Sequence, residues 1–244
     1  MKSYSINFKP TSDQIEEIKT WLIEEESNLG KGFYCNWSSI AHSFNDGKIA
    51  VLIEKQCAIG FITWFEWEKF ARIQIAEIKP DYRRKGFGKY MTERLFEKLE
   101  KKGIAVIDLH CQPATSQKIW KRMGFKRFPD VKDFIKENNE KEPYLYKILV
   151  PHLKPTKSSA LKESIQLWQI EPHLARQESY ALKWHPRFEK GSRRLVYPII
   201  SPAKREWQIQ WSKNDGTFKS DKIKYLLRID IDFGNFLIIN ELPQ

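Results

Sequence analysis

The sequence predicts an α/β (α+β) protein in which residues 1–150 alternate strands and helices and residues 161–244 form a small β-rich domain. Three observations support this prediction. In the first part, apolar residues recur at every second position in some segments and at helical spacing in others. Pro151–Ser159 is rich in Pro, Lys and Ser, which is typical of a linker and places one at 151–160. Beyond it, short strand-like runs are separated by turn residues.

The elements of the first domain follow from periodicity and capping residues. Ser3–Phe8 alternates as a first strand, and Pro10–Asp13 offers helix caps before a helix at Gln14–Glu25, which Asn28–Gly32 ends. The remaining elements that we expect are a short helix at Trp37–Phe44, strands at Lys48–Glu54, Cys57–Trp67 and Ala71–Ile78, a helix at Lys89–Lys102, a strand at Ala105–His110, a helix that begins at Thr115 or Ser116, and a last strand at Tyr144–Val150.

The second domain has a different pattern of short runs and hairpin signals. Asn214-Asp215-Gly216 is typical of a tight turn between two strands. Trp207, Ile209 and Trp211 share one face of their strand, for which core packing is the favoured interpretation and a ligand platform the alternative. No family resemblance is evident in this part, and its role stays open. The expected strands are Ile165–Ile170, Leu195–Ile200, Trp207–Trp211, Ile223–Ile231 and Phe236–Leu242.

Composition narrows the class of protein. Hydrophobic residues make up 41% of the chain, enough for a core, but no apolar run approaches the roughly 18 residues of a membrane span, so we expect no membrane partner. The three cysteines, Cys35, Cys57 and Cys111, are scattered and fit neither a disulfide framework nor a metal site. We therefore expect no metal and a location in the reducing cytoplasm.

The net charge of +11 favours anionic partners. Residues 151–244 hold 16 Lys and Arg against 10 Asp and Glu, so the shorter C-terminal part is the more basic per residue. A coenzyme A tail, a nucleic acid bound by the C-terminal part, and an acidic protein all fit this charge. Solubility alone explains it equally well.

A basic, glycine-containing loop joins a predicted strand to a predicted helix. It runs through Arg83-Arg84-Lys85-Gly86-Phe87-Gly88-Lys89. Glycines at this spacing let the backbone approach a ligand closely, and their N–H groups can point at an anion. The helix that follows adds unpaired N–H groups and the positive end of its dipole. The loop therefore predicts a phosphate-binding site.

The surroundings of the loop resemble the GCN5-related N-acetyltransferase (GNAT) family over residues 1–150. The strand before the loop ends in Ile78-Lys79-Pro80, and the loop follows at the family's spacing. A second family signature is similar to Ile119–Phe125, which closes on Gly-Phe. The resemblance implies a mixed, mostly antiparallel sheet with helices on both faces. It also implies transfer of an acetyl group from acetyl-CoA to a primary amine, on a small molecule, a peptide N-terminus or a lysine.

The resemblance also implies which residues bind the cosubstrate. The backbone of Ile78 corresponds to the position that pairs with the pantetheine arm, and the thioester is expected where its strand and Ala105–His110 splay apart. The residues expected to hold the pyrophosphate are Arg83, Arg84, Lys85, Gly86, Phe87, Gly88 and Lys89.

Acetyl transfer to an amine needs a base for the ammonium and an acid for the thiolate. Alternation puts Asp108 and His110 on one face of a central strand, and Asp108 corresponds to a catalytic glutamate of some family members. Glu77, on the face of Ile73 and Ile75, is a second candidate base. The alternatives are a solvated strand end for Asp108 and His110 and a salt bridge for Glu77.

Two positions depart from the family pattern. Trp120 stands where the family often has the tyrosine that protonates the thiolate, and an indole cannot supply that proton. Pro113 replaces a common asparagine. The sequence therefore leaves a second hypothesis open: a domain that binds CoA without catalysis, coupled to a β domain that binds nucleic acid or protein.

Overall fold

The computed structural model describes residues 4–30, 32–129, 143–157, 161–213, 216–226 and 235–242. The chain divides into two compact units. The first unit comprises Met1–Arg127 and Glu137–Leu149, and the second comprises Phe128–Lys136 and Val150–Gln244.

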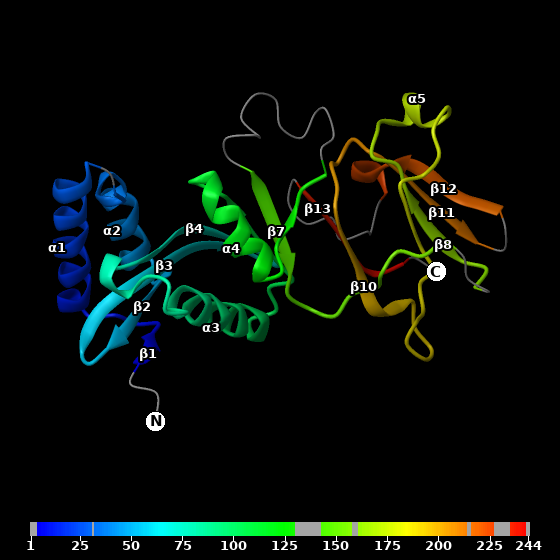
Figure 1. Ribbon diagram of the computed structural model, residues 1–244. Coiled ribbons are helices and arrows are strands. Elements are labelled where there is room, and N and C mark those ends of the chain that lie inside the picture. Colours follow the sequence, from blue (N-terminus) through cyan, green and yellow to red (C-terminus); the bar gives the residue numbers. More distant parts are fainter. Residues whose placement is uncertain are drawn as a thin grey trace. The chain divides into compact units, whose positions relative to one another are not determined.

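Within the described residues, the first unit is built on a seven-stranded sheet of order β1-β2-β3-β4-β5-β7-β6 (Figure 1). Neighbouring strands are antiparallel except β4 and β5, which run parallel. The predicted mixed, mostly antiparallel sheet is therefore confirmed. Its strands are β1 (Tyr4–Asn7), β2 (Ile49–Glu54), β3 (Cys57–Trp67), β4 (Phe70–Ile78), β5 (Val106–His110), β6 (Lys126–Arg127) and β7 (Tyr144–Ile148).

Helices cover both faces of this sheet. The long helix α1 (Ser12–Leu29) exceeds its predicted range because Thr11 and Gln14 form a capping box at its start and Gly30, with φ of 62°, ends it. The other helices are α2 (Trp37–Asn45), α3 (Phe87–Lys101) and α4 (Gln117–Arg122). The element order of the first unit agrees with the prediction.

Alternating residues of the strands supply two separate cores. One core joins α1 and α2 to the sheet through residues such as Ile18, Ile40 and Phe61. The other joins α3 to the opposite face through residues such as Leu95 and Ile62. Each face is buried because side chains alternate along a strand and both alternating sets are apolar here.

A β-bulge in β4 interrupts this alternation beside the cavity described below. Thr63 of β3 pairs with Ile75 and Trp64 pairs with Ile73, so Gln74 has no partner in the register. As a result, Ile73 packs in the core of α3 while Ile75 packs in the core of α1. The prediction that Glu77 shares a face with both isoleucines was wrong. The bulge directs Ile75 toward α1 and leaves Ile73 on the opposite face of the sheet, which packs against α3.

The second unit is β-rich, as predicted. A four-stranded sheet of order β12-β11-β8-β9 and a two-stranded sheet β10-β13 are formed by its described residues. Trp207, Ile209 and Trp211 are buried in one hydrophobic core, which confirms the core-packing interpretation. Its elements are β8 (Ser164–Leu167), α5 (Pro172–Ala175), β9 (Leu182–Trp184), β10 (Arg194–Pro202), β11 (Gln208–Lys213), β12 (Gly216–Lys222) and β13 (Phe236–Glu241).

Two strand predictions in this unit need comment. The predicted strand Ile223–Ile231 begins instead as a 3₁₀ turn at Ile223–Tyr225, and residues 227–231 lie outside the described part. The strands β9 and β12 were not predicted. Both contain polar and charged residues, and their pairing with β8 and β11 comes from tertiary context.

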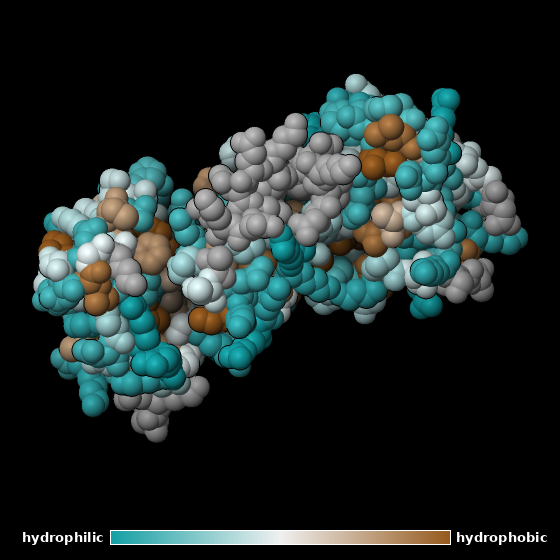
Figure 2. Space-filling view, turned by 45° about the horizontal axis from the view of Figure 1, so that its top comes forward, coloured by the Kyte–Doolittle hydropathy of each residue, from teal (hydrophilic) through white to brown (hydrophobic). Residues whose placement is uncertain are grey.

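The face in Figure 2 is mainly hydrophilic, with apolar residues in separate small patches. Among the residues that the structure describes, no helix has the length and apolar character needed to cross a membrane.

Candidate active site

The splay predicted between two strands of the first unit is present. β4 and β5 pair only from Phe70–Arg72 to Val106–Asp108. Beyond this point the strands separate, and Ile73–Ile78 forms one wall of a cavity of about 690 Å³. That volume lies within the range of small-molecule and cofactor sites.

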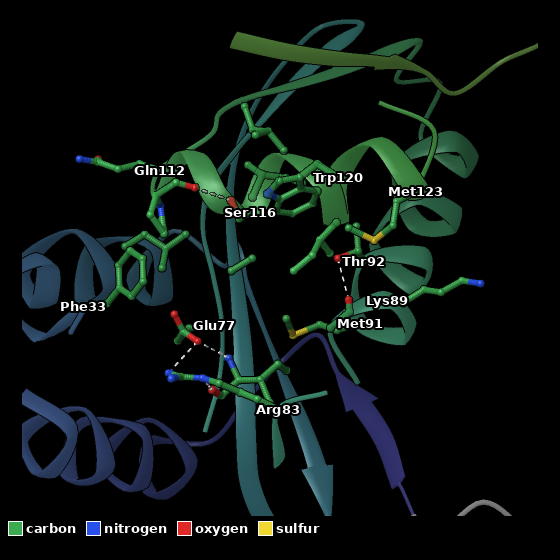
Figure 3. Close-up of a pocket in the computed structure, with 18 of the residues that line it drawn as sticks. Phe33, Glu77, Arg83, Lys89, Met91, Thr92, Gln112, Ser116, Trp120 and Met123 are labelled. Carbon is green, nitrogen blue, oxygen red and sulfur yellow. Dashed lines mark hydrogen bonds and ion pairs between the residues drawn. The ribbon is translucent and has the colours of Figure 1, made fainter. Parts of the chain in front are cut away.

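The other walls of the cavity come from three further segments (Figure 3). These are the glycine loop with the start of α3, the chain from Leu109 through α4, and Phe33 before α2. In Figure 3, Phe33 and Glu77 lie on one side of the space and Lys89 and Met123 on the other. The carboxylate of Glu77 therefore lies on one side of the space with Arg83, and the Lys89 side chain extends away from the space on the other side.

The glycine loop has the geometry of an anion site. Gly86 has φ of 86° and immediately precedes α3, where the first N–H groups of the helix have no intrahelical partner. A Cβ atom at Gly86 would meet nothing within 4 Å, so the space beside this backbone is open. Arg84, Lys89 and Arg122 are among the residues that line the same cavity. Unpaired amides, open space and positive charge together fit a phosphate group.

Two of the predicted cosubstrate residues do not line the cavity with the rest. Phe87 is buried and packs its ring against Tyr4 and Tyr82, so that only its backbone can serve a ligand. The ammonium of Lys85 lies 5.3 Å from the ring centroid of Tyr82. The predicted residues that line the cavity are Ile78, Arg83, Arg84, Gly86, Gly88 and Lys89.

The peptide groups of Ile78 point away from β3. Lys79 N donates to Ile59 O at 2.9 Å, so the neighbouring register pair of Gly60 and Ile78 is a non-hydrogen-bonded pair. β3 requires glycine at position 60, because an added Cβ would lie 2.5 Å from Ile78 Cδ1 and 2.8 Å from Glu77 O. The N–H and C=O of Ile78 are thus directed toward the open side of β4.

Arg83 was predicted to add positive charge for the pyrophosphate, but its guanidinium is engaged by two carboxylates. Its Nη2 lies 2.6 Å from Glu25 Oε1 and 3.0 Å from Glu77 Oε1, and its Nε donates to Ile78 O at 2.7 Å. Of the other cations of the predicted loop, Arg84 and Lys89 line the cavity.

Glu25 was not predicted to belong to the site. It lies on the buried stripe of α1 with Ile15, Ile18, Trp21 and Leu22, and only 8% of its surface is exposed. A charged residue on the apolar stripe of an amphipathic helix is unusual unless it is paired. That position is the signal by which Glu25 could have been found.

Glu77 is the carboxylate that lines the cavity. Burial raises its pKa, the nearby charge of Glu25 raises it further, and Arg83 opposes both effects. Its Oε1 accepts a hydrogen bond from Ile78 N at 2.9 Å. The predicted alternative for Glu77, a salt bridge, is thus present with Arg83, yet the carboxylate remains at the wall of the cavity.

Asp108 and His110 differ in their access to the cavity. Asp108 is fully buried, accepts two hydrogen bonds from Arg72 at 2.7 and 3.0 Å, and is hydrogen-bonded by Tyr144 Oη. Burial raises its pKa to about 6 against the opposing effect of Arg72. Asp108 is not among the residues that line the cavity. Because its side chain is fully buried, it does not belong to a solvated strand end. His110 lines the cavity, and its ring stacks on Tyr144 with centroids 4.6 Å apart.

Asp108→Asn is expected to destabilise the protein rather than to abolish chemistry. The substitution leaves the Arg72 guanidinium without its anionic partner, and breaking a buried pair costs about 3–5 kcal/mol. We expect about 3 kcal/mol, because 36% of the Arg72 side chain is exposed. Urea unfolding measures this loss, with Asp46→Asn at a surface pair as the control. A normal unfolding midpoint combined with a large loss of turnover would instead make Asp108 catalytic.

Trp120 both packs in the core of α3 and lines the cavity. Its ring meets Phe125 edge-on, with centroids 5.3 Å apart and planes at 72°. In Figure 3 the indole lies between Ser116 and Met123. The packing and cavity-wall roles considered for Trp120 are therefore combined in one side chain.

If the cavity carries out the acetyl transfer that the family resemblance implies, Trp120→Tyr is expected to keep or raise its rate, because a phenol at this wall supplies a proton donor that indole lacks. Loss of ring volume is expected to cost about 1–2 kcal/mol of stability. Steady-state kinetics of Trp120→Tyr and Trp120→Phe separate the hydroxyl from the packing change. Equal rates in the two variants would show that a hydroxyl at this position does not reach the leaving group.

No group of three or more His, Cys, Asp or Glu side chains suited to a metal ion occurs in the described ranges.

Comparisons with known proteins agree with this geometry. Residues 12–125 match the model of the acetyltransferase (GNAT) family. No protein of curated function matches the chain. The similarity to known proteins is confined to the part of the chain that carries the cavity.

Several solved structures are similar to the chain. The PaiA N-acetyltransferase of Thermoplasma acidophilum, in complex with coenzyme A, has 19% identity and a TM-score of 0.46, over 60% of this chain and 99% of that chain. The ribosomal-protein-S18-alanine N-acetyltransferase of Escherichia coli has 18% identity and a TM-score of 0.44, over 59% and 90%. A structure assigned to the GNAT family from Desulfovibrio desulfuricans has 7% identity and a TM-score of 0.50, over 60% and 99%. At such identities the likeness concerns the fold.

Proposed function

We propose that this protein is an N-acetyltransferase that uses acetyl-CoA as cosubstrate and a primary amine as acceptor, because residues 12–125 match the model of the acetyltransferase (GNAT) family. One observation carries the proposal. A single cavity combines the anion-binding loop at Gly86, the outward-pointing peptide groups of Ile78 and the carboxylate of Glu77. These are the three features that acetyl transfer from CoA requires: a phosphate site, a strand edge for an amide-containing arm, and a base.

The residues at the loop fit the cosubstrate. The N–H groups at the start of α3 and the side chains of Arg84 and Lys89 would hold the pyrophosphate. The peptide groups of Ile78 would pair with the amides of the pantetheine arm in the manner of an added strand. When bound, acetyl-CoA supplies an activated acetyl group.

Glu77 is the proposed base. An acceptor amine arrives as an ammonium ion, and its nitrogen can attack only after losing a proton. The raised pKa of Glu77 brings its basicity closer to neutral pH. As the new C–N bond forms and the C–S bond breaks, the departing thiolate needs a proton. His110 is the proposed donor because it lines the same cavity and an imidazolium can donate a proton.

Asp108 has a supporting part in this proposal. Its carboxylate fixes Tyr144, and the Tyr144 ring lies against His110 with an interplanar angle of 23°. Asp108 therefore positions His110 through Tyr144 and does not touch the substrates.

The experiment that tests the proposal measures thiol release from acetyl-CoA with a panel of amines. The panel contains peptides with free N-termini or lysines, polyamines, aminoglycosides and aminoacyl-tRNA. We expect turnover with at least one acceptor, together with an acetylated product of matching mass. Tight CoA binding without turnover across the panel would favour the alternative, a CoA-binding domain that has lost catalysis.

The cellular setting belongs to the same proposal. Cys35 and Cys57 are free and exposed, which suits the reducing cytoplasm. A nucleic-acid partner for the basic second unit gains no support from the comparisons and is not part of the proposal.

A further inference from the structure

We propose that Glu25 is a positioning residue that keeps the Arg83 guanidinium in place when the cosubstrate binds. The cosubstrate takes the hydrogen bond of the Ile78 N–H away from Glu77. The Glu77 carboxylate is then free to act as a base only when the cosubstrate is bound. This inference rests on the proposed function. Its starting point is that both polar groups of Ile78 already make hydrogen bonds within the protein, the N–H to Glu77 and the C=O with Arg83.

The N–H and the C=O of Ile78 differ in the number of hydrogen bonds that each can make. A peptide N–H has one hydrogen to donate, whereas a carbonyl oxygen has two lone pairs. An amide-containing ligand that pairs with the edge of β4 therefore competes with Glu77 for the N–H but can share the C=O with Arg83. Glu77 has to move when the ligand pairs, and Arg83 can stay.

The position of Arg83 then decides whether Glu77 becomes an effective base. If the guanidinium followed Glu77, their existing ion pair would hold the carboxylate ionised and weaken it as a proton acceptor. Two observations indicate that it remains with Glu25. Its Nη2 is nearer to Glu25 than to Glu77, at 2.6 against 3.0 Å. Only 6% of the Glu25 side chain is exposed, against 15% for Glu77, so the loss of its cation is the costlier of the two.

The second oxygen of Glu25 strengthens this argument. Among the described residues, Glu25 Oε2 is buried and has no hydrogen-bond partner. The carboxylate therefore depends on Arg83 for its compensation. Because the two side chains are 58 residues apart in the sequence, this pair also fixes the loop before Gly86 to α1.

A change in proton binding follows. The Ile78 N–H and the Arg83 charge lower the pKa of Glu77, while burial and Glu25 raise it. Loss of the N–H bond on ligand pairing removes a contribution that favours the ionised form, so the pKa of Glu77 rises. The complex then binds more protons than the free protein at the same pH. Other charged groups of the cavity can also bind or release protons when the ligand binds, so variants are needed to isolate the contribution of Glu77. These groups are His110, Arg84, Lys89 and Arg122.

The experiment is calorimetric titration of the full chain with CoA in buffers of different ionisation enthalpy, between pH 5 and 8. The slope of the observed binding enthalpy against the ionisation enthalpy of the buffer gives the number of protons taken up. Wild type is expected to take up protons, and Glu77→Gln is expected to lose that uptake while it still binds CoA. Glu25→Gln is expected to lose most of the uptake, because Arg83 then pairs with Glu77 alone. In the same variant the acid limb of the kcat/KM profile should move to lower pH.

The matched control is Glu24→Gln, which removes the same charge from an exposed neighbouring position of α1. It should behave as wild type. If Glu25→Gln does not fold, Glu25→Asp replaces it, because the shorter side chain withdraws the carboxylate from Arg83 and keeps its charge. Glu25→Asp should lose part of the proton uptake.

Two results would overturn the inference. In one, CoA binds to wild type without any proton uptake that Glu77→Gln removes. In the other, Glu25→Gln lowers stability but keeps the wild-type uptake and pH profile, which would make Glu25 purely structural. Failure of the proposed function is a separate outcome, since CoA would then not bind or no amine would be acetylated.

Discussion

Glu77→Gln is expected to lower kcat by about 100-fold or more while CoA still binds. General bases contribute about 10²- to 10⁴-fold to a rate, and the amide keeps the size of the side chain but cannot accept the proton. Glu77 is the carboxylate of the cavity wall, and its pKa is raised by burial. Wild-type kcat/KM should therefore rise with pH through a pKa above the usual glutamate range. This acid limb should be absent from the variant.

A matched control for Glu77 is Glu66 in the neighbouring strand β3. Lys48 and Lys102 bind Glu66 and hold its pKa at about 2, and it lies away from the cavity. Its lowered pKa stabilises the folded protein above the unfolded-state pKa near 4.5, and this contribution is lost as the pH falls toward 2. Glu66→Gln should therefore change acid stability and leave the acid limb of kcat/KM in place. If the acid limb of the kcat/KM profile were unaltered in Glu77→Gln, the base would be His110 or water.

Gly86→Val is expected to abolish the thermal stabilisation that acetyl-CoA gives to wild type. At a ligand concentration of 100 times Kd, that stabilisation is about 2.7 kcal/mol. The valine Cβ would meet nothing within 4 Å in the empty protein, so the fold can accept it sterically, but the side chain would occupy the space beside the loop amides. The φ of 86° adds a strain of about 1–2 kcal/mol for any residue with a Cβ.

The control for that strain is Gly103→Val. Gly103 follows α3, has φ of 82°, and likewise has nothing within 4 Å of an added Cβ. Differential scanning fluorimetry with and without acetyl-CoA should show a similar loss of stability in both variants. Only Gly103→Val should keep the full ligand shift. A full shift in Gly86→Val would rule out the loop as the phosphate site.

Much of the first unit could be predicted because its signals are local. The continuous apolar run within Lys48–Glu54 and the helical spacing after Lys89 each concern residues within a few positions of one another. The glycine loop is equally local, since the φ of Gly86 and the unpaired amides of α3 arise within one turn of chain. The order of elements was accordingly within reach of the sequence, whereas the site of the cavity and the role of the Ile78 backbone were expected from the resemblance to the GNAT family.

The partners of the charged residues were decided only by the tertiary structure. The bulge at Gln74 places Ile73 and Ile75 on opposite faces of the sheet, and no local pattern announces it. Arg83 meets Glu25 across 58 residues, and Asp108 meets Arg72 across 36. A long charged side chain can reach many partners, and burial selects the one that compensates its charge. The sequence by itself determined the backbone frame that can hold a cosubstrate, and packing determined which carboxylate lines the cavity and which is paired away from it.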